Sequence, residues 1–194
     1  MKPDMLPQTR LAIDMALAEP AKRICWIDGP EGPLWLKRAE NLSFYWRLRK
    51  GNSHAAFEAD RRAMRLLAQA RMPVPAILAE GPDYFVTADH GYNLAYLLSH
   101  ARPTLAESCA ILAAAGRALA GLHLAGFCHG RPSVRDLLWD GANITLIDFE
   151  RFAPQRNRSR HRAMDLLILI QSVFVYGGDA HEEAGALLAA YGQT

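Results

Sequence analysis

The segment 121–149, GLHLAGFCHGRPSVRDLLWDGANITLIDF, constrains the fold more than any other part of the chain. It predicts the end of a helix, a polar loop that begins at His129-Gly130, two short strands around a Gly-Ala-Asn turn, and Asp148 at the end of the second strand. That order places the loop and the carboxylate of Asp148 side by side. Such an arrangement suits the binding of a nucleotide's phosphates through a divalent metal ion.

The bulk properties of the chain predict one domain, or two small lobes that share a cleft. The 194 residues are 51% apolar and 22% charged, which is an ordinary composition for a globular protein. The net charge of +2 is too small to indicate nucleic acid as a partner. The three cysteines, which are Cys25, Cys109 and Cys128, lack metal-ligand spacing and predict a reducing compartment without disulfides.

No signal peptide or membrane span is expected. The first 20 residues carry three acidic side chains and lack the apolar core of a signal peptide. The longest apolar run, 166–176, is interrupted by Gln171 and is shorter than the ~20 residues that a membrane span needs. These features predict a soluble, cytoplasmic protein, for which a peripheral position at the inner membrane face stays open.

The first half of the chain predicts mostly strands. A short leading helix is expected over 9–18, with Thr9 as its cap and the side chains of Leu11, Met15 and Leu17 on one side. Two apolar runs around the turn 29–32 predict a β-hairpin. An amphipathic helix over 55–70 and strands at 76–80 and 83–89 follow, while 41–54 has no clear pattern.

The second half predicts mostly helices, and the change of character near residue 90 indicates two units, an N-lobe of residues 1–90 and a C-lobe of residues 91–194. Thr104 is the expected cap of a long helix that ends before Gly126. The expected elements are a helical segment at 94–100, the long helix at 105–124, a hairpin of 137–140 with 144–148, a buried helix at 163–176 and a last helix at 181–191. The predicted class is therefore α+β, with a β-rich first lobe and a truncated helical second lobe.

Three charged positions stand out beside the loop. In the second strand of the first hairpin, Lys37 points away from the face that carries Leu34 and Leu36, which fits a lysine in the expected cleft or, as the alternative, an exposed lysine on an edge strand. On the helix over 55–70 an acidic residue, Asp60 or Glu58, is positioned to pair with this lysine. Asp148 follows the apolar strand ITLI and precedes Phe149.

The stretches LWLKRAE, FEADRRAMRLL, LAGLHLAGFCHG and ITLIDFERF together resemble the bacterial lipopolysaccharide-core kinases, which include the Kdo and heptose kinases. The resemblance covers roughly residues 22–172 and implies a protein-kinase-like fold with two lobes. It also implies binding of ATP with Mg²⁺ or Mn²⁺ and transfer of phosphate to a hydroxyl on a sugar, a lipopolysaccharide or a protein.

The resemblance also assigns roles to the loop. It implies that Lys37 and the acidic residue on the helix, Asp60 or Glu58, bind the nucleotide. It also implies that Asp148 holds the metal ion and that His129 and Arg131 belong to the catalytic loop. The segment Val134-Arg135-Asp136-Leu137 imitates the signature of the catalytic base. However, the interval of 12 residues from Asp136 to Asp148 is that of the second metal-binding position.

In this register Arg131 occupies the position of the catalytic aspartate, and it cannot accept a proton. A guanidinium there could instead pair with a phosphate or stabilise transferring charge. Two further positions, His123 and Asp165, are expected to support the loop structurally. No glycine-rich loop that would cover the phosphates is found in the first hairpin.

Three functions are compatible with this pattern. The first is an atypical phosphotransferase that uses Lys37, Asp136 and Asp148. The second is a pseudokinase that acts as a nucleotide-binding or regulatory module, and the third is an interaction domain at the inner membrane face. The Arg-rich segment 151–162 suggests an anionic sugar, a lipid headgroup or a protein as a partner, and a solvated charged loop is the alternative.

Overall fold

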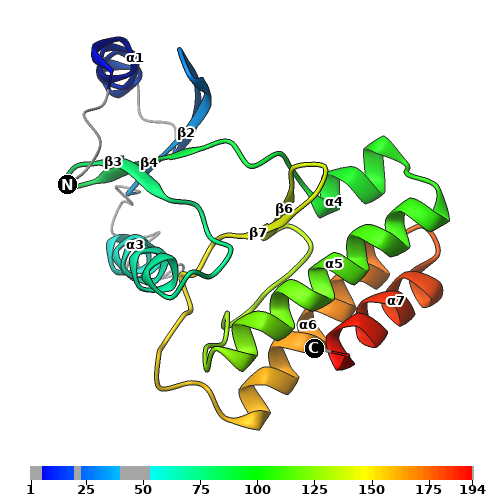
Figure 1. Cartoon of the computed structure of the whole chain (residues 1–194). Helices are drawn as coiled ribbons and strands as arrows, with labels where there is room; N and C mark the ends of the chain where they lie inside the picture. Colours follow the sequence, from blue (N-terminus) through cyan, green and yellow to red (C-terminus); the bar gives the residue numbers. More distant parts are fainter. Residues whose placement is uncertain (1–5, 20–22, 40–52, 194) are drawn as a thin grey trace, which may run out of the picture.

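The computed structural model describes residues 6–19, 23–39 and 53–193, which form a β-rich lobe and a helical lobe (Figure 1). The two-lobed α+β architecture is therefore confirmed, whereas the exact boundary near residue 90 stays a prediction. The first lobe comprises α1 (Pro7–Ala18), β1 (Ile24–Gly29), β2 (Gly32–Arg38), α3 (Ser53–Gln69), β3 (Ile77–Glu80) and β4 (Tyr84–Ala88). The segment 41–54, which has no clear pattern in the sequence, falls almost entirely outside the described residues.

The first lobe is built on an antiparallel sheet with the strand order β1-β2-β4-β3. The alternation predicted for β2 is confirmed, because Leu34 and Leu36 are buried on one face with Ile13 of α1. Trp35 and Lys37 lie on the opposite face, toward the second lobe. Helix α3 packs on that side through Phe57, whose ring stacks on Phe85 of β4 at 5.3 Å.

The leading helix differs from its prediction at its start and in its packing face. Its N-cap is Leu6, and a proline begins its first turn, so that Thr9 lies inside the helix and is buried rather than acting as the cap. The side chains of Leu11 and Met15 are 61% and 65% exposed. Ile13 packs against the sheet instead, because only one side of this short helix contacts the apolar side chains of β1 and β2.

The second lobe contains a small antiparallel sheet and the longer helices. Its elements are β5 (Tyr92–Asn93), α4 (Leu94–Tyr96), the π-helical turn η1 (Leu97–Ala101), α5 (Leu105–Leu124), β6 (Leu137–Trp139), β7 (Ile144–Leu146), α6 (Ser159–Tyr176) and α7 (Ala180–Gly192). The strand order of the sheet is β5-β6-β7. Sequence analysis missed β5, because a strand of two residues has no readable periodicity.

Helix α5 has the bounds and the cap that the sequence predicts. The hydroxyl of Thr104 accepts a hydrogen bond from the backbone of Glu107, whose carboxylate accepts one from the backbone of Thr104 in return. By length and apolar composition alone α5 could cross a membrane, a test that the core helix of a folded domain also passes. Here α5 packs against α7 and β7, and its Leu112, Leu119 and Leu122 are fully buried.

Helix α6 was predicted to be buried, and this is wrong for one of its faces. Asp165, Leu169 and Val173 are buried against the rest of the lobe. On the other side, apolar residues such as Leu167 and Val175 are 60% and 68% exposed. The sequence is apolar all round the helix, and periodicity cannot tell that the neighbouring elements cover only half of it.

Candidate active site

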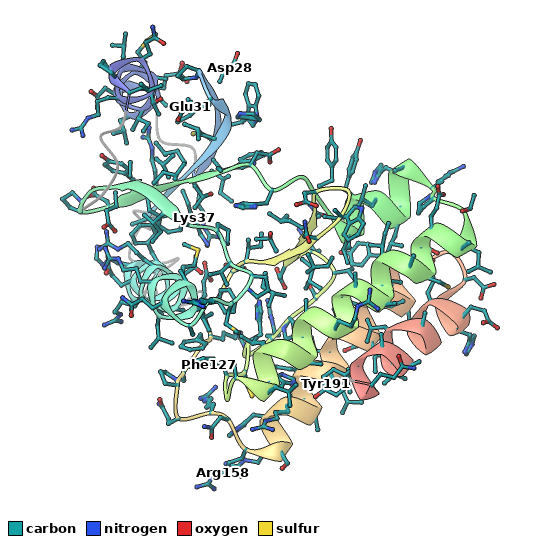
Figure 2. The ribbon with its side chains drawn as sticks, viewed as in Figure 1. Asp28, Glu31, Lys37, Phe127, Arg158 and Tyr191 are labelled. Carbon is teal, nitrogen blue, oxygen red and sulfur yellow. The ribbon has the colours of Figure 1, made fainter. Side chains whose placement is uncertain are left out.

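The main cavity of the described residues lies between the two lobes and has a volume of about 700 Å³. Trp35, Lys37 and Phe85 line it from the first sheet, and Met64 lines it from α3. On the other side it is lined by side chains of the loop 131–136, β6 and the end of β7, including Arg131, Ser133, Arg135, Asp136, Leu138 and Asp148. Lys37 lies where β2 approaches α3 (Figure 2).

Lys37 joins the two sides of this cavity. Its Nζ donates to Oδ2 of Asp60 at 2.7 Å and to Oδ1 of Asp148 at 3.1 Å, and it lies 3.6 Å from Oε1 of Glu150. Burial alone would lower the pKa of Lys37, but the surrounding carboxylates, with Asp60 foremost, outweigh burial and raise it. The lysine is therefore a fixed cation at neutral pH.

The structure decides between the two acidic residues that sequence analysis left open. Asp60 is only 1% exposed and uses both oxygens, one for Lys37 and the other, Oδ1, for the backbone N–H of Phe149 at 2.8 Å. Glu58 turns to Arg61 instead, at 2.6 Å. Because Asp is shorter than Glu, the short pair brings α3 close to β2 and to residue 149.

Asp148 has a backbone conformation that few residues adopt. Its φ of 68° lies in the left-handed region, which is strained for most side chains and tolerated best by Gly, Asn and Asp. Burial would raise the pKa of this carboxyl, yet the charge of Lys37 lowers it below its ordinary range. The side chain is therefore an anion that reaches the cavity from the strand end.

Asp136 is held in place by Ser133. One carboxylate oxygen, Oδ2, accepts from the Ser133 backbone N–H at 2.9 Å and from its hydroxyl at 2.8 Å. The backbone of Asp136 is tied to the other strand, because its carbonyl accepts from the N–H of Ile147 at 2.9 Å. Burial raises the pKa of Asp136, and the charge of Asp148 adds to this effect. The carboxylates of Asp136 and Asp148 line the same cavity.

The loop that begins at His129 is fixed by Asp165 of α6. The Asp165 carboxylate accepts from the backbone N–H groups of His129 at 2.6 Å and of Gly130 at 3.0 Å. The ring of His129 is buried, with its Nε2 2.9 Å from the carbonyl of Ile147. A catalytic role for His129 stays a prediction, and its position is that of a residue that shapes the loop.

Gly130 is required at its position on steric grounds. Its φ is +104°, and a Cβ there would come within 2.6 Å of the carbonyl oxygen of Arg151. The loop can therefore lie directly against the segment that follows Phe149.

His123, Cys128 and Asp165 form a buried group whose potential ligand atoms all lie within 4.8 Å of one another. Burial raises the pKa of Cys128 to about 11, so that the thiol is neutral near pH 7. The ring of His123 bonds to the hydroxyl of Tyr191 at 2.8 Å, and the oxygens of Asp165 already accept from the loop. The hydrogen bonds of this group join α5, α6 and α7 to the loop and support it.

Comparison with known families agrees with this geometry. The lipopolysaccharide kinase (Kdo/WaaP) family matches residues 88–191, which include the loop, Asp148 and α6. The chain belongs to this family. Its kinase-like fold, which the residues of the loop and the strand predicted, is thereby confirmed.

Two curated proteins are similar to the chain. An uncharacterized protein of Haemophilus influenzae is 30% identical over 139 residues, which cover 72% of this chain and 57% of that protein. A probable bifunctional tRNA threonylcarbamoyladenosine biosynthesis protein of Haloquadratum walsbyi is 28% identical, in a match that covers 76% of this chain and 28% of that protein. The chain therefore spans little more than half of one relative and about a quarter of the other.

In this member of the Kdo/WaaP family, two cavity features escaped sequence analysis. Arg23 contacts Glu150, so that the residue before β1 is joined to the residue two positions after Asp148. Tyr92 and Tyr96 line the cavity mouth, with their rings stacked at 4.9 Å. Neither feature has a local signal in the sequence, because Arg23 and Glu150 are far apart in the chain and Tyr92 lies in β5 rather than on the helix that carries Tyr96.

The donor set of this Kdo/WaaP-family cavity suits a hard divalent cation. Asp136 and Asp148 offer carboxylate oxygens, which are the ligands that Mg²⁺ and Mn²⁺ prefer. Within the described residues, neither the Arg131 nor the Arg135 side chain contacts a carboxylate, so that both remain available to anionic groups. Cation-binding and anion-binding groups therefore meet in one cavity.

Proposed function

We propose that this protein binds ATP with Mg²⁺ or Mn²⁺ and transfers the γ-phosphoryl group to a hydroxyl of a sugar, a lipopolysaccharide or a protein. The observation that carries the proposal is the contact of one lysine with Asp60 and Asp148 across the cavity, with Asp136 in the same wall. Membership of a kinase family supports it. In kinase-like sites a nucleotide is positioned by a lysine, an acidic residue on a helix and an aspartate after a strand, and here these are Lys37, Asp60 and Asp148.

In the proposed site Lys37 binds phosphate oxygens and Asp60 keeps the lysine aimed at them. Asp136 and Asp148 would hold the divalent ion, which when bound neutralises phosphate charge. Met64, Phe85 and Leu138 provide an apolar part of the cavity that suits the flat base of the nucleotide.

Arg131 at the position of a catalytic aspartate changes how transfer would work. The reaction forms a bond between the acceptor oxygen and the γ-phosphorus and breaks the bond to the ADP oxygen, and the hydroxyl proton leaves to solvent. Because the transition state of phosphoryl transfer is loose, it needs little help from a base and much charge stabilisation. We infer that Arg131 supplies that stabilisation.

Ligand-induced thermal stabilisation tests the binding half of the proposal. ATP with Mg²⁺ or Mn²⁺ at a hundred times its Kd should stabilise the protein by about 2.7 kcal/mol. Asp148→Asn should lose most of this gain, because the amide carries no charge for the ion. The matched control is Asp83→Asn, an exposed residue that does not line the cavity. An equal gain in the wild type and Asp148→Asn would refute the proposed site.

Production of ADP tests the transfer half. The protein is incubated with ATP, the ion and lipopolysaccharide-core sugars or a mixture of proteins, and ADP is measured against the Asp148→Asn variant. Acceptor-dependent ADP supports phosphoryl transfer. Stabilisation by ATP without ADP for any acceptor would instead identify a pseudokinase, the second function that the substitution at residue 131 allows.

We also propose a cytoplasmic location, since the reaction needs ATP and the described residues contain no disulfide.

A further inference from the structure

Helix α6 presents an apolar face that nothing in the described residues covers. The four large side chains on this face, with the exposed fraction of each, are Met164 at 55%, Leu167 at 60%, Phe174 at 49% and Val175 at 68%. Phe174 is the one that touches another helix, through an edge contact with the ring of His181 in α7. The proposed nucleotide site makes no use of these residues, since none lines its cavity.

These positions form one continuous stripe along the helix. The spacing 160, 164, 167, 171, 174 and 175 follows the i, i+3, i+4 pattern of a single helical face, and spans roughly 22 Å at 1.5 Å per residue. The opposite face carries the buried residues Asp165, Leu169 and Val173. An exposed arginine, Arg160, begins the stripe, and Gln171 is the polar position within it.

A strongly basic segment leads directly into this stripe. Residues 151–162 contain five arginines and no acidic residue, which gives the segment a charge of +5. Arg151, Arg156, Arg158 and Arg160 are exposed, and in the part of the chain that the structure describes none of them contacts a carboxylate. Arg158 projects outward at the N-terminal end of α6 (Figure 2).

We infer that the α6 stripe, together with the basic segment 151–162, is a docking surface for an anionic phospholipid bilayer. The charge complementarity is direct: exposed guanidinium groups attract the headgroups, and the apolar side chains enter the boundary between headgroups and acyl chains. Four apolar side chains are few for a stable protein interface, which buries about 800 Å² on each partner. For a peripheral membrane contact, an apolar stripe and a cluster of charges act together and are sufficient.

This inference does not depend on phosphoryl transfer. The stripe and Asp165 lie on opposite faces of the same helix, so that the apolar stripe faces away from the loop that Asp165 holds at His129 and Gly130. Substitutions in the stripe should therefore leave the stabilisation by ATP and the divalent ion unchanged.

Vesicle flotation tests the inference. The full chain is mixed with vesicles of phosphatidylcholine alone or of phosphatidylcholine with phosphatidylglycerol, and the bound fraction is measured at low and high salt. Binding to the anionic vesicles alone, and weaker binding at high salt, is the expected result. The triple variant Arg156→Gln, Arg158→Gln, Arg160→Gln should bind about a hundredfold more weakly. The triple variant Met164→Gln, Leu167→Gln, Val175→Gln should bind about tenfold more weakly.

Matched controls use exposed residues elsewhere on the protein. Arg10→Gln, Arg62→Gln and Arg117→Gln remove the same charge from other surfaces, and Leu11→Gln with Met15→Gln removes the exposed apolar residues of α1. The inference is supported if vesicle binding survives in both control variants and is weakened as stated in the arginine triple variant and in the apolar triple variant. It is overturned if the two sets behave alike, or if the α1 control alone loses binding.

A second copy of the chain is the competing occupant of the stripe. Light scattering after gel filtration separates the two cases. A dimer that the apolar variant converts to a monomer, without binding to either vesicle, would overturn the inference and assign the stripe to self-association.

Discussion

The two walls of the cavity differ in how completely their charged groups are paired. On the side of β2 and α3, Lys37 and Asp60 have close partners and lie largely out of solvent. On the side of the loop, Arg131 and Arg135 are exposed and contact no carboxylate within the described residues. The first wall is held in place by its ion pairs, whereas the second carries Arg131 at the position where a kinase of ordinary sequence has an aspartate. Binding and turnover can therefore be separated by mutation.

The largest effect is expected from the paired wall. Lys37→Met removes the cation that joins Asp60 and Asp148, and leaves both carboxylates without it. ADP production should fall about a thousandfold, and the stabilisation by ATP should disappear. Arg62→Met, an exposed cation on α3, is the control and should keep both. Retention of turnover by Lys37→Met would remove the paired wall from the mechanism.

The next effect concerns folding rather than chemistry. Asp60→Ala leaves Lys37 buried without its closest partner and the N–H of Phe149 without its acceptor. We expect a loss of about 3 kcal/mol in the free energy of unfolding. Glu58→Ala, on the same helix, should cost below about 1 kcal/mol, because its pair with Arg61 is partly exposed. Urea denaturation without ligand measures both, and equal losses would contradict the distinction.

The unpaired wall is tested by Arg131→Ala. If the guanidinium stabilises the transferring phosphoryl group, ADP production should fall about a hundredfold while stabilisation by ATP changes little. Arg131→Lys should recover part of the rate, since it keeps the charge but loses the planar fork. A loss of ATP binding that matches the loss of rate would instead make Arg131 an anchor of the ground state.

The smallest effect is expected at the base of the loop. Gly130→Ala places a Cβ against the Arg151 carbonyl at an unfavourable φ, and should cost about 2 kcal/mol of stability. Because Cys128 lies two residues away, is buried and has a pKa of about 11, it should resist alkylation near pH 7.5 in the wild type. Faster alkylation in Gly130→Ala, followed by mass spectrometry, would show that the loop has moved.

Sequence patterns predicted the directions of Lys37 and Asp148 well, because each is fixed by a single strand or by the end of one. Period-two alternation placed Lys37 opposite Leu34 and Leu36, and the end of an apolar strand placed Asp148. The cap at Thr104 was predicted for the same local reason. Local rules are sufficient where a single strand or turn fixes the direction of a side chain.

The features that the sequence did not predict depend on which elements meet. The face of α1 that packs, the half-exposed state of α6 and the contact of Arg23 with Glu150 each require the position of a distant partner. The apolar content of α1 and of α6 did not indicate which side of either helix would be covered. The choice between Asp60 and Glu58 was open for the same reason, because residues two apart on a helix point to different sides, and the side of α3 that meets β2 depends on packing.

The pairing of Lys37 has a mechanical consequence. The ammonium group of Lys37 contacts Asp60 on α3 of the first lobe and Asp148, which follows β7 of the second lobe. The contact of Arg23 with Glu150 also joins the two lobes. Side chains that we expect to bind the nucleotide, Lys37 and Asp148, are therefore the same ones that join the two lobes. These contacts hold the two lobes together, and we expect that an incoming phosphate must displace a carboxylate before Lys37 can bind it.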